Sequence, residues 1–166
     1  MTKPIIAPAF CQVAWVVRDI AVAEKFFIEK MGISRFMHMD NLAAKDTEGT
    51  YMGKPGNWVC HLHIAYAGNT QIELIQPVSG ASMYQESLDR HGDTVQHVAY
   101  WLDDADCDAA ATHLESSGYR QIQSFRLPIL RVGYYDTRRA IGVVTEIVGS
   151  SEEGHELRRN LQAGTF

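Results

Sequence analysis

One pattern of residues occurs twice in this chain of 166 residues, and the repeat limits the possible folds more than any other feature. Residues 11–20 read CQVAWVVRDI and residues 96–105 read QHVAYWLDDA. When Gln12 is placed over His97, a valine, an alanine, an aromatic residue and a later aspartate coincide. Both segments are rich in β-branched and aromatic residues, which predicts a strand in each copy.

An amphipathic helix is expected after each of these strands. Residues 21–32 and 104–118 carry small and apolar residues at a spacing close to i, i+3, i+4. Asp19 and Asp104 are predicted N-caps, because a carboxylate accepts hydrogen bonds from the free N–H groups of a first helical turn. The glycine that closes each range suits the left-handed conformation in which many helices end.

The two copies also end alike. Residues 71–75 read QIELI and residues 144–148 read VTEIV, each with a lone glutamate inside a short apolar strand. Two further strand-like stretches lie between the helix and the last strand of each copy. We therefore expect an α+β domain of two βαβββ modules, 9–78 and 94–149, joined by a helix at about 81–92.

Four polar residues occupy equivalent positions in the two copies: Gln12 and His97 on the first strand, Glu73 and Glu146 on the last. A polar side chain in an apolar strand is unfavourable unless it is paired or binds something, so two repeat-related pairs indicate one shared site. Two carboxylates, one imidazole and one amide suit one divalent metal ion, and they do not distinguish Zn, Ni, Co, Mn or Mg. About two positions of an octahedral ion stay open for water or substrate, as catalysis by a metal requires.

The composition limits the partners and the compartment. The formal net charge is −5 and no run of basic residues occurs, so neither a nucleic-acid nor a membrane partner is expected. No stretch of about 18 apolar residues predicts a membrane-spanning helix. Cys11, Cys60 and Cys107 fit free thiols in a reducing compartment better than a disulfide framework, which favours a cytoplasmic protein.

At these residues the sequence resembles the vicinal oxygen chelate superfamily, which includes glyoxalases, bleomycin-resistance proteins and dioxygenases. The motifs are QVAWVVRD from Gln12, IELIQP from Ile72, HVAYWLDD from His97 and VTEIV from Val144. The resemblance covers about residues 9–149. It implies the glyoxalase fold, in which paired modules form a cup-shaped mixed sheet with metal ligands on the first and last strands. It also implies a homodimer.

Two branches of the superfamily are similar in different ways. The run from ELIQP to QHVAYWLDD resembles methylmalonyl-CoA epimerases, whereas the set Gln, Glu, His, Glu is similar to that of some glyoxalase I enzymes. Epimerases more often carry His in place of Gln12 and Gln in place of Glu73. Extradiol dioxygenases hold Fe(II) with two His and one Glu, and Gln12 leaves that set incomplete. Bleomycin-resistance proteins lack the metal ligands.

The predicted function is a metal-dependent isomerase or lyase that removes a proton next to the carbonyl of a small carbonyl or thioester substrate. The resemblance implies that a ligating glutamate acts as base, with Glu146 the first candidate and Glu73 the second. His97 and Gln12 stay as ligands. The alternatives are a non-catalytic binding protein of the same fold and an extradiol-type dioxygenase.

The register of the strands decides which other side chains face the metal. A two-residue hairpin at 68–69 places Ile64 opposite Glu73, so His61 and His63 face away from the site. The register, the two-residue period and, for the last residue, the family resemblance predict four pocket-lining side chains: Tyr66, Gln71, Trp101 and Tyr135.

Three other features have weaker expectations. The segment 38–57 is long for a connection, and long loops are often lids, which here would bring Glu48 over the site. Arg126 and Arg131 are candidates for an anionic substrate tail, although exposed arginines are usually solvated. Residues 150–166 are polar and are expected to form a peripheral tail.

Overall fold

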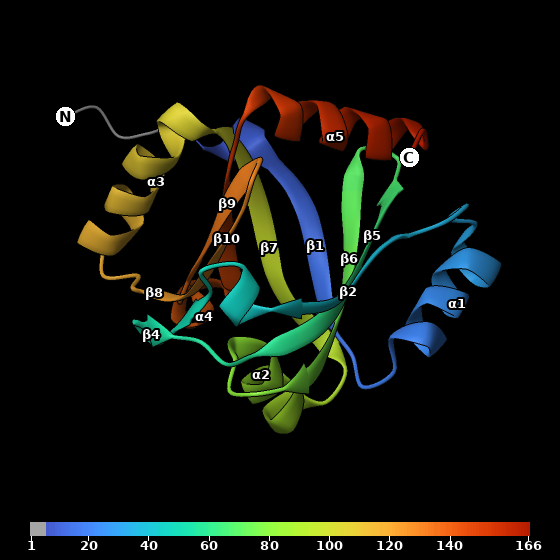
Figure 1. The fold of residues 1–166 in the computed structure, drawn as a ribbon, viewed down its shortest axis with the longest axis horizontal. Coiled ribbons are helices and arrows are strands. Elements are labelled where there is room, and N and C mark those ends of the chain that lie inside the picture. Colours follow the sequence, from blue (N-terminus) through green and yellow to red (C-terminus); the bar gives the residue numbers. More distant parts are fainter. Residues whose placement is uncertain (1–5) are drawn as a thin grey trace.

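A computed structural model describes residues 6–166. Their strands form one mixed sheet in the order β2-β5-β6-β1-β7-β10-β9-β8-β3-β4. The sheet curls into a cup (Figure 1), which confirms the expected α+β fold with two βαβββ modules. The first module consists of β1 (Phe10–Val16), α1 (Ile20–Met31), β2 (Met37–Ala43), β5 (Val59–Ala67) and β6 (Thr70–Ser79).

The second module repeats this order. It consists of β7 (Thr94–Asp103), α3 (Asp104–Ser116), β8 (Gln121–Leu127), β9 (Leu130–Tyr135) and β10 (Val144–Ser150). The remaining elements are η1 (Ala7–Ala9), η2 (Ala44–Asp46), β3 (Thr50–Tyr51), β4 (Lys54–Pro55), α2 (Met83–His91), α4 (Arg138–Ile141) and α5 (Glu152–Ala163).

The two modules meet along their first strands. β1 pairs antiparallel with β7 at the centre of the sheet, and each of them pairs in parallel with the last strand of its own module, β6 or β10. Each parallel pair is joined through the rest of its module, including the helix α1 or α3 that packs on the outside of the sheet (Figure 1). The four strands that carry the repeat motifs therefore lie side by side.

The helix ends follow the expected chemistry except at the start of α3, and Gly118 after α3 has the expected positive φ, 89°. The Asp19 carboxylate accepts a hydrogen bond from the Val22 N–H at 3.1 Å, and Gly32 ends α1 in the left-handed conformation. The prediction that Asp104 is an N-cap is wrong. Asp103 occupies that position, and the Asp104 carboxylate accepts a hydrogen bond from Arg131 Nε at 2.6 Å instead.

The long segment after β2 closes one side of the cup. Its strand β3 pairs with β8, so residues of the first module extend the far edge of the second. Trp58, which is buried, donates a hydrogen bond to the Thr50 carbonyl and fixes the segment against the core. The segment brings no acid to the site, because the Glu48 side chain is 83% exposed and lies 3.9 Å from Arg126.

The C-terminal residues are more closely integrated than expected. Instead of a peripheral tail they form α5, which crosses one end of the cup from β10 to β5 (Figure 1). Leu161 is buried in the main core, and Gln162 donates a hydrogen bond to Asn69 at the β5–β6 turn. The sequence did not predict that this helix packs on the core, because α5 is mostly polar and only Leu157 and Leu161 form its apolar face.

No helix within residues 6–166 has both the length and the apolar character that crossing a bilayer requires.

Candidate metal centre

The structure brings the four repeat-related polar residues together inside the cup. Gln12 Nε2 lies 3.1 Å from Glu73 Oε2, 3.0 Å from Glu146 Oε2 and 3.1 Å from His97 Nε2. His97 Nε2 is 3.1 Å from Glu73 Oε2 and 3.0 Å from Glu146 Oε2. All four residues are buried. Residues separated by up to 134 positions therefore present their polar ends to one point.

Two alanines explain how four polar side chains fit at this point. Ala14 is the strand partner of both Glu73 and His97, and Ala99 is the partner of both Gln12 and Glu146. Both alanines are fully buried. Each is the small residue of the repeat motif, so the positions between neighbouring polar residues carry only a methyl group. This leaves the space in which the longer side chains converge.

The imidazole of His97 is held by residues outside the group of four. Its Nδ1 lies 2.6 Å from Gln96 Oε1, an acceptor that requires a proton on Nδ1 and so directs Nε2 at the centre. The ring also packs edge-on against Tyr134, with centroids 5.2 Å apart. The Tyr84 hydroxyl, from the linking helix α2, donates a hydrogen bond to the Tyr134 hydroxyl at 2.8 Å. The orientation of His97 is thus fixed before any ligand binds.

The two buried carboxylates at the centre favour the binding of a cation. Burial raises the pKa of Glu73, and the nearby His97 offsets this only in part. Burial also opposes a charge on His97, but Glu146 and Glu73 outweigh it and raise the pKa of His97 to about 9. Among residues 6–166, no lysine or arginine pairs with either glutamate. The proton on His97 is the nearest positive charge, and a dication there would take its place.

The donor atoms fit a divalent ion. Neighbouring ligand atoms of an octahedral ion with bonds of about 2.1 Å lie about 3.0 Å apart, which matches the separations of 3.0–3.1 Å. Gln12 places its amide nitrogen toward the carboxylates, and a half-turn of the amide presents the oxygen instead. Gln12, Glu73, His97 and Glu146 would hold the ion, with no thiolate among them.

An apolar cavity of about 70 Å³ leads to this centre. Its wall is built from residues of both modules and of α5, among them Met39, Leu62, Phe125, Val148 and Leu157. No lysine or arginine lines it within the described part of the chain.

Two polar atoms in the wall lack a partner. Gln71 Oε1 and Trp101 Nε1 are buried, and neither makes a hydrogen bond within residues 6–166. Both side chains line the cavity. A buried polar group without a hydrogen bond is unfavourable by about 1–3 kcal/mol. A polar ligand in the cavity could therefore donate a hydrogen bond to Gln71 Oε1 and accept one from Trp101 Nε1.

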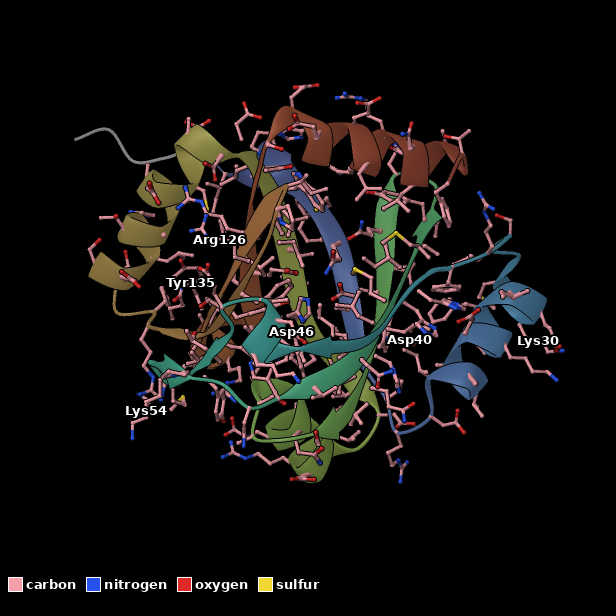
Figure 2. The ribbon with its side chains drawn as sticks, in the orientation of Figure 1. Lys30, Asp40, Asp46, Lys54, Arg126 and Tyr135 are labelled. Carbon is pink, nitrogen blue, oxygen red and sulfur yellow. The ribbon has the colours of Figure 1, made fainter. Side chains whose placement is uncertain are left out.

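The remaining predicted pocket residues fare differently. Tyr66 is not among the residues that line the cavity. Its hydroxyl accepts a hydrogen bond from Gln71 Nε2 at 3.3 Å and another from Arg158 of α5 at 3.2 Å. Tyr135 is wrongly predicted: it packs outside the sheet with Leu102 and Cys107, toward α3 (Figure 2). The neighbouring tyrosine faces inward, since Tyr134 is the strand partner of Glu146. The motif GYY contained both, but only the pairing of β9 with β10 identifies the inward one.

The predicted hairpin register is confirmed. Ile64 pairs with Glu73, and His61 and His63 face outward, away from the four converging residues. Arg126 and Arg131 are also turned away from the cavity. Arg131 lies 2.5 Å from Asp108 on α3, and this guanidinium lowers the pKa of Asp108.

With this geometry established, comparison with known proteins gives the family. Residues 11–128 match the Glyoxalase/Bleomycin resistance protein/Dioxygenase superfamily. The chain belongs to this superfamily. No curated protein matches the chain.

Solved structures share the fold at low sequence identity. Methylmalonyl-CoA epimerase from Mycobacterium tuberculosis is 22% identical, with a TM-score of 0.62 over 91% of this chain and 93% of that one. Hypothetical protein BH1468 from Bacillus halodurans is 15% identical, with a TM-score of 0.61 over 86% and 94%. A Streptomyces coelicolor methylmalonyl-CoA epimerase variant in complex with 2-nitronate-propionyl-CoA is 20% identical, with a TM-score of 0.59 over 86% and 94%.

Proposed function

We propose that this protein is a divalent-metal-dependent isomerase that moves a proton at the carbon next to a carbonyl, with an acyl thioester as the favoured substrate class. The observation that carries the proposal is the convergence of four polar side chains at the end of an apolar cavity. Gln12 Nε2 and His97 Nε2 lie 3.1 Å apart, and each lies 3.0–3.1 Å from both the Glu73 and the Glu146 carboxylate. A divalent ion bound there supplies positive charge beside the oxygen atoms of the substrate.

The side chains divide into holding and reacting groups. His97 is held in place by Gln96, and the amide of Gln12 is too weakly basic to accept a proton, so these two act as ligands. Glu146 is the proposed base, because it lines the cavity and its free oxygen can receive the substrate's proton. Glu73 lines the same cavity and is the second candidate.

The cavity supports a short acyl group whose polar end reaches the proposed metal centre. Its apolar wall lacks lysine and arginine within the described residues, so a short acyl chain fits and the phosphates of a coenzyme must stay outside. Trp101 Nε1 and Gln71 Oε1 offer one donor and one acceptor to the polar end of that acyl group. The structural neighbours named methylmalonyl-CoA epimerase make methylmalonyl-CoA the first substrate to test.

The test follows exchange of the proton next to the carbonyl. Metal-loaded protein is incubated with methylmalonyl-CoA in deuterated water, and incorporation of deuterium is followed by mass spectrometry. Glu146→Gln weakens metal binding, so it is assayed at a metal concentration that saturates its inner site. There it should slow exchange by about 10²–10⁴-fold, because the ion keeps three ligands but the base is gone. Glu115→Gln, an exposed glutamate on α3, is the matched control and should exchange at the wild-type rate.

The outcomes separate the candidate functions. Full exchange by Glu146→Gln with loss of exchange in Glu73→Gln would reassign the base. No exchange by metal-loaded wild-type protein with any acyl thioester, but turnover of a methylglyoxal–thiol adduct, would replace the isomerase with a glyoxalase-type lyase. Absence of both reactions and of bound metal would leave a binding protein. The expected homodimer stays a prediction that light scattering checks.

A further inference from the structure

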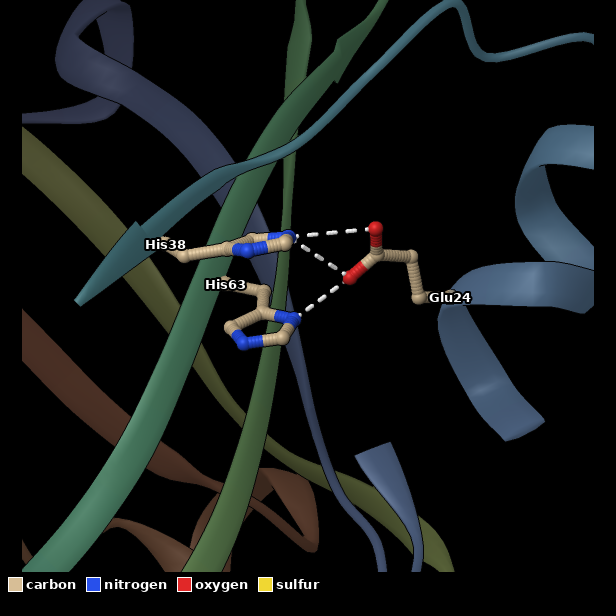
Figure 3. Close-up of side chains that lie close together, drawn as sticks. All are labelled: Glu24, His38 and His63. Atoms are coloured by element: carbon tan, nitrogen blue, oxygen red, sulfur yellow. Dashed lines mark hydrogen bonds and ion pairs between the residues drawn. The ribbon is translucent and has the colours of Figure 1, made fainter. Parts of the chain in front are cut away.

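A second group of metal-binding side chains lies on the outer face of the sheet. Glu24 of α1, His38 of β2 and His63 of β5 meet between the helix and the two strands (Figure 3). The Glu24 carboxylate lies 2.9 and 3.1 Å from His38 Nε2, and one of its oxygens lies 2.5 Å from His63 Nδ1. One nitrogen of each ring and one carboxylate are thus directed at a common point.

The sheet itself brings the two rings together. His38 and His63 are direct strand partners in the antiparallel pair of β2 and β5, and their rings stack with centroids 3.8 Å apart. Because strand residues alternate between faces, both rings lie on the side opposite to Glu73, the partner of Ile64. This outer group is therefore separated from the inner one by the sheet.

The second ring nitrogen of His63 also has an acidic neighbour. His63 Nε2 lies 3.3 Å from Asp40 Oδ1, so Asp40 can accept the Nε2 proton when Nδ1, the nitrogen beside Glu24, binds a cation. A metal-binding histidine usually has such an outer partner, commonly a carboxylate, on its other nitrogen. The two carboxylates of Glu24 and Asp40 would neutralise one dication.

We propose that Glu24, His38 and His63 form a second binding site, for a divalent transition metal such as Zn²⁺. Two imidazoles and one carboxylate are borderline donors that favour Zn²⁺ and its transition-metal neighbours over Mg²⁺ or Ca²⁺. Ligand atoms around a tetrahedral ion with bonds of about 2.0–2.1 Å lie about 3.3 Å apart, so the Glu24 carboxylate must withdraw by about 0.4 Å from His38 Nε2 and by about 0.8 Å from His63 Nδ1. The rotatable side chain of Glu24 and the exposed His38, with 46% of its side chain accessible, permit this.

The burial of the three side chains sets where the ion would be open. His63 is 8% exposed and Glu24 17% exposed, whereas His38 forms the outer wall. The fourth position of the ion faces solvent on this side and would hold water. The ion would tie α1 to the edge strands β2 and β5, a link between elements that the rest of the module joins mainly through apolar contacts.

Metal counting on the whole protein tests the site. Protein stripped with a chelator is titrated with Zn²⁺ at micromolar concentration, passed through a desalting column and analysed for bound metal. We expect two ions in the wild type, one in His38→Ala and one in Glu24→Gln. The matched control His91→Ala, an exposed histidine on α2, should keep two. Glu146→Gln weakens only the inner site and should keep the outer ion.

A second readout locates the ion without a mutation. Zinc is added to isotope-labelled wild-type protein, and amide resonances are followed by NMR. The outer ion should shift amides of α1, β2 and β5 around the three ligands. Shifts confined to the strands of the inner site, with no change near His38, would overturn the proposal even if a variant failed to fold.

The possible counts separate the two sites. One ion in the wild type that survives in His38→Ala but is lost in Glu146→Gln would refute the outer site and leave the inner one standing. One ion that is lost in His38→Ala but retained in Glu146→Gln would support the outer site and refute the inner one. In the first case the outer group is a hydrogen-bonded cluster in which Glu24 accepts from both rings.

Discussion

Removing the metal from the inner site should lower the free energy of unfolding by about 3 kcal/mol. The ligand atoms of Glu73, His97 and Glu146 lie within 4.8 Å of one another. Two ionised carboxylates no farther apart than this repel by about 3.5 kcal/mol or more at an effective dielectric constant of about 20. The proton that His97 takes up, with a pKa of about 9, offsets part of this repulsion. An ion present at one hundred times its dissociation constant stabilises by a similar amount, about 2.7 kcal/mol.

Thermal unfolding measures this change. For a chain of this size, 1 kcal/mol shifts Tm by about 2–4 °C, so chelation should lower Tm by about 6–12 °C. The measurement is made in His38→Ala, in which the proposed outer ion cannot contribute. Zn, Ni, Co, Mn and Mg are then added back one at a time, and the ion that restores Tm at the lowest concentration identifies the preferred metal.

Two results would refute this reasoning. An equal Tm with and without chelator, in protein that contains metal beforehand, would show that the ion does not stabilise the fold through these residues. Equal chelator sensitivity in the double variant His38→Ala/Glu146→Gln would show that the ion binds elsewhere. In that case the proton on His97 would be the positive charge that offsets the Glu73 and Glu146 carboxylates.

Three further changes test the packing around the inner site. Ala99→Leu should abolish binding of the inner ion and destabilise by about 1–3 kcal/mol, because it fills the space between two of the four polar residues; metal content is measured against Ala109→Leu, an exposed helix position. Leu161→Ala should reduce stability in urea by about 2–4 kcal/mol, and an unchanged midpoint would show that α5 does not pack on the core. Gly80→Ala should lower Tm, because its Cβ would lie 2.2 Å from the Asn57 carbonyl oxygen at a φ of +77°; a Tm equal to that of the wild type contradicts this.

The repeat allowed the fold and the four inner residues to be predicted from the sequence. The alternation of side chains along a strand is local, so the position of a residue in its motif already states which face it takes. Once Gln12 is placed over His97 and Glu73 over Glu146, the symmetry of the two modules brings all four to one place. The hairpin register at residues 68–69 followed for the same reason, because a two-residue turn fixes the pairing of its strands.

The predictions that were wrong concern side chains whose position depends on contacts between residues far apart in the sequence. Tyr134 and Tyr135 are adjacent in β9, and only the pairing of that strand with β10 turns Tyr134 inward. Asp104 would suit an N-cap, but β7 continues to Asp103 and Arg131 takes the Asp104 carboxylate. The segment around Glu48 was expected near the site, and the pairing of β3 with β8 carries it to the far edge of the sheet.

The sequence by itself determined that Gln12, Glu73, His97 and Glu146 converge, because they lie in repeated motifs whose periodicity sets the face that each side chain takes. Only the tertiary structure decided how that site is enclosed and what lies outside the sheet. Closure by α5 depends on two leucines that reach the core across the cup. The outer group exists because α1 places Glu24 over His38 and His63, residues of two strands that the sequence separates and the sheet pairs. Such contacts depend on how helices and strands pack against one another, and a local pattern of residues does not specify that packing.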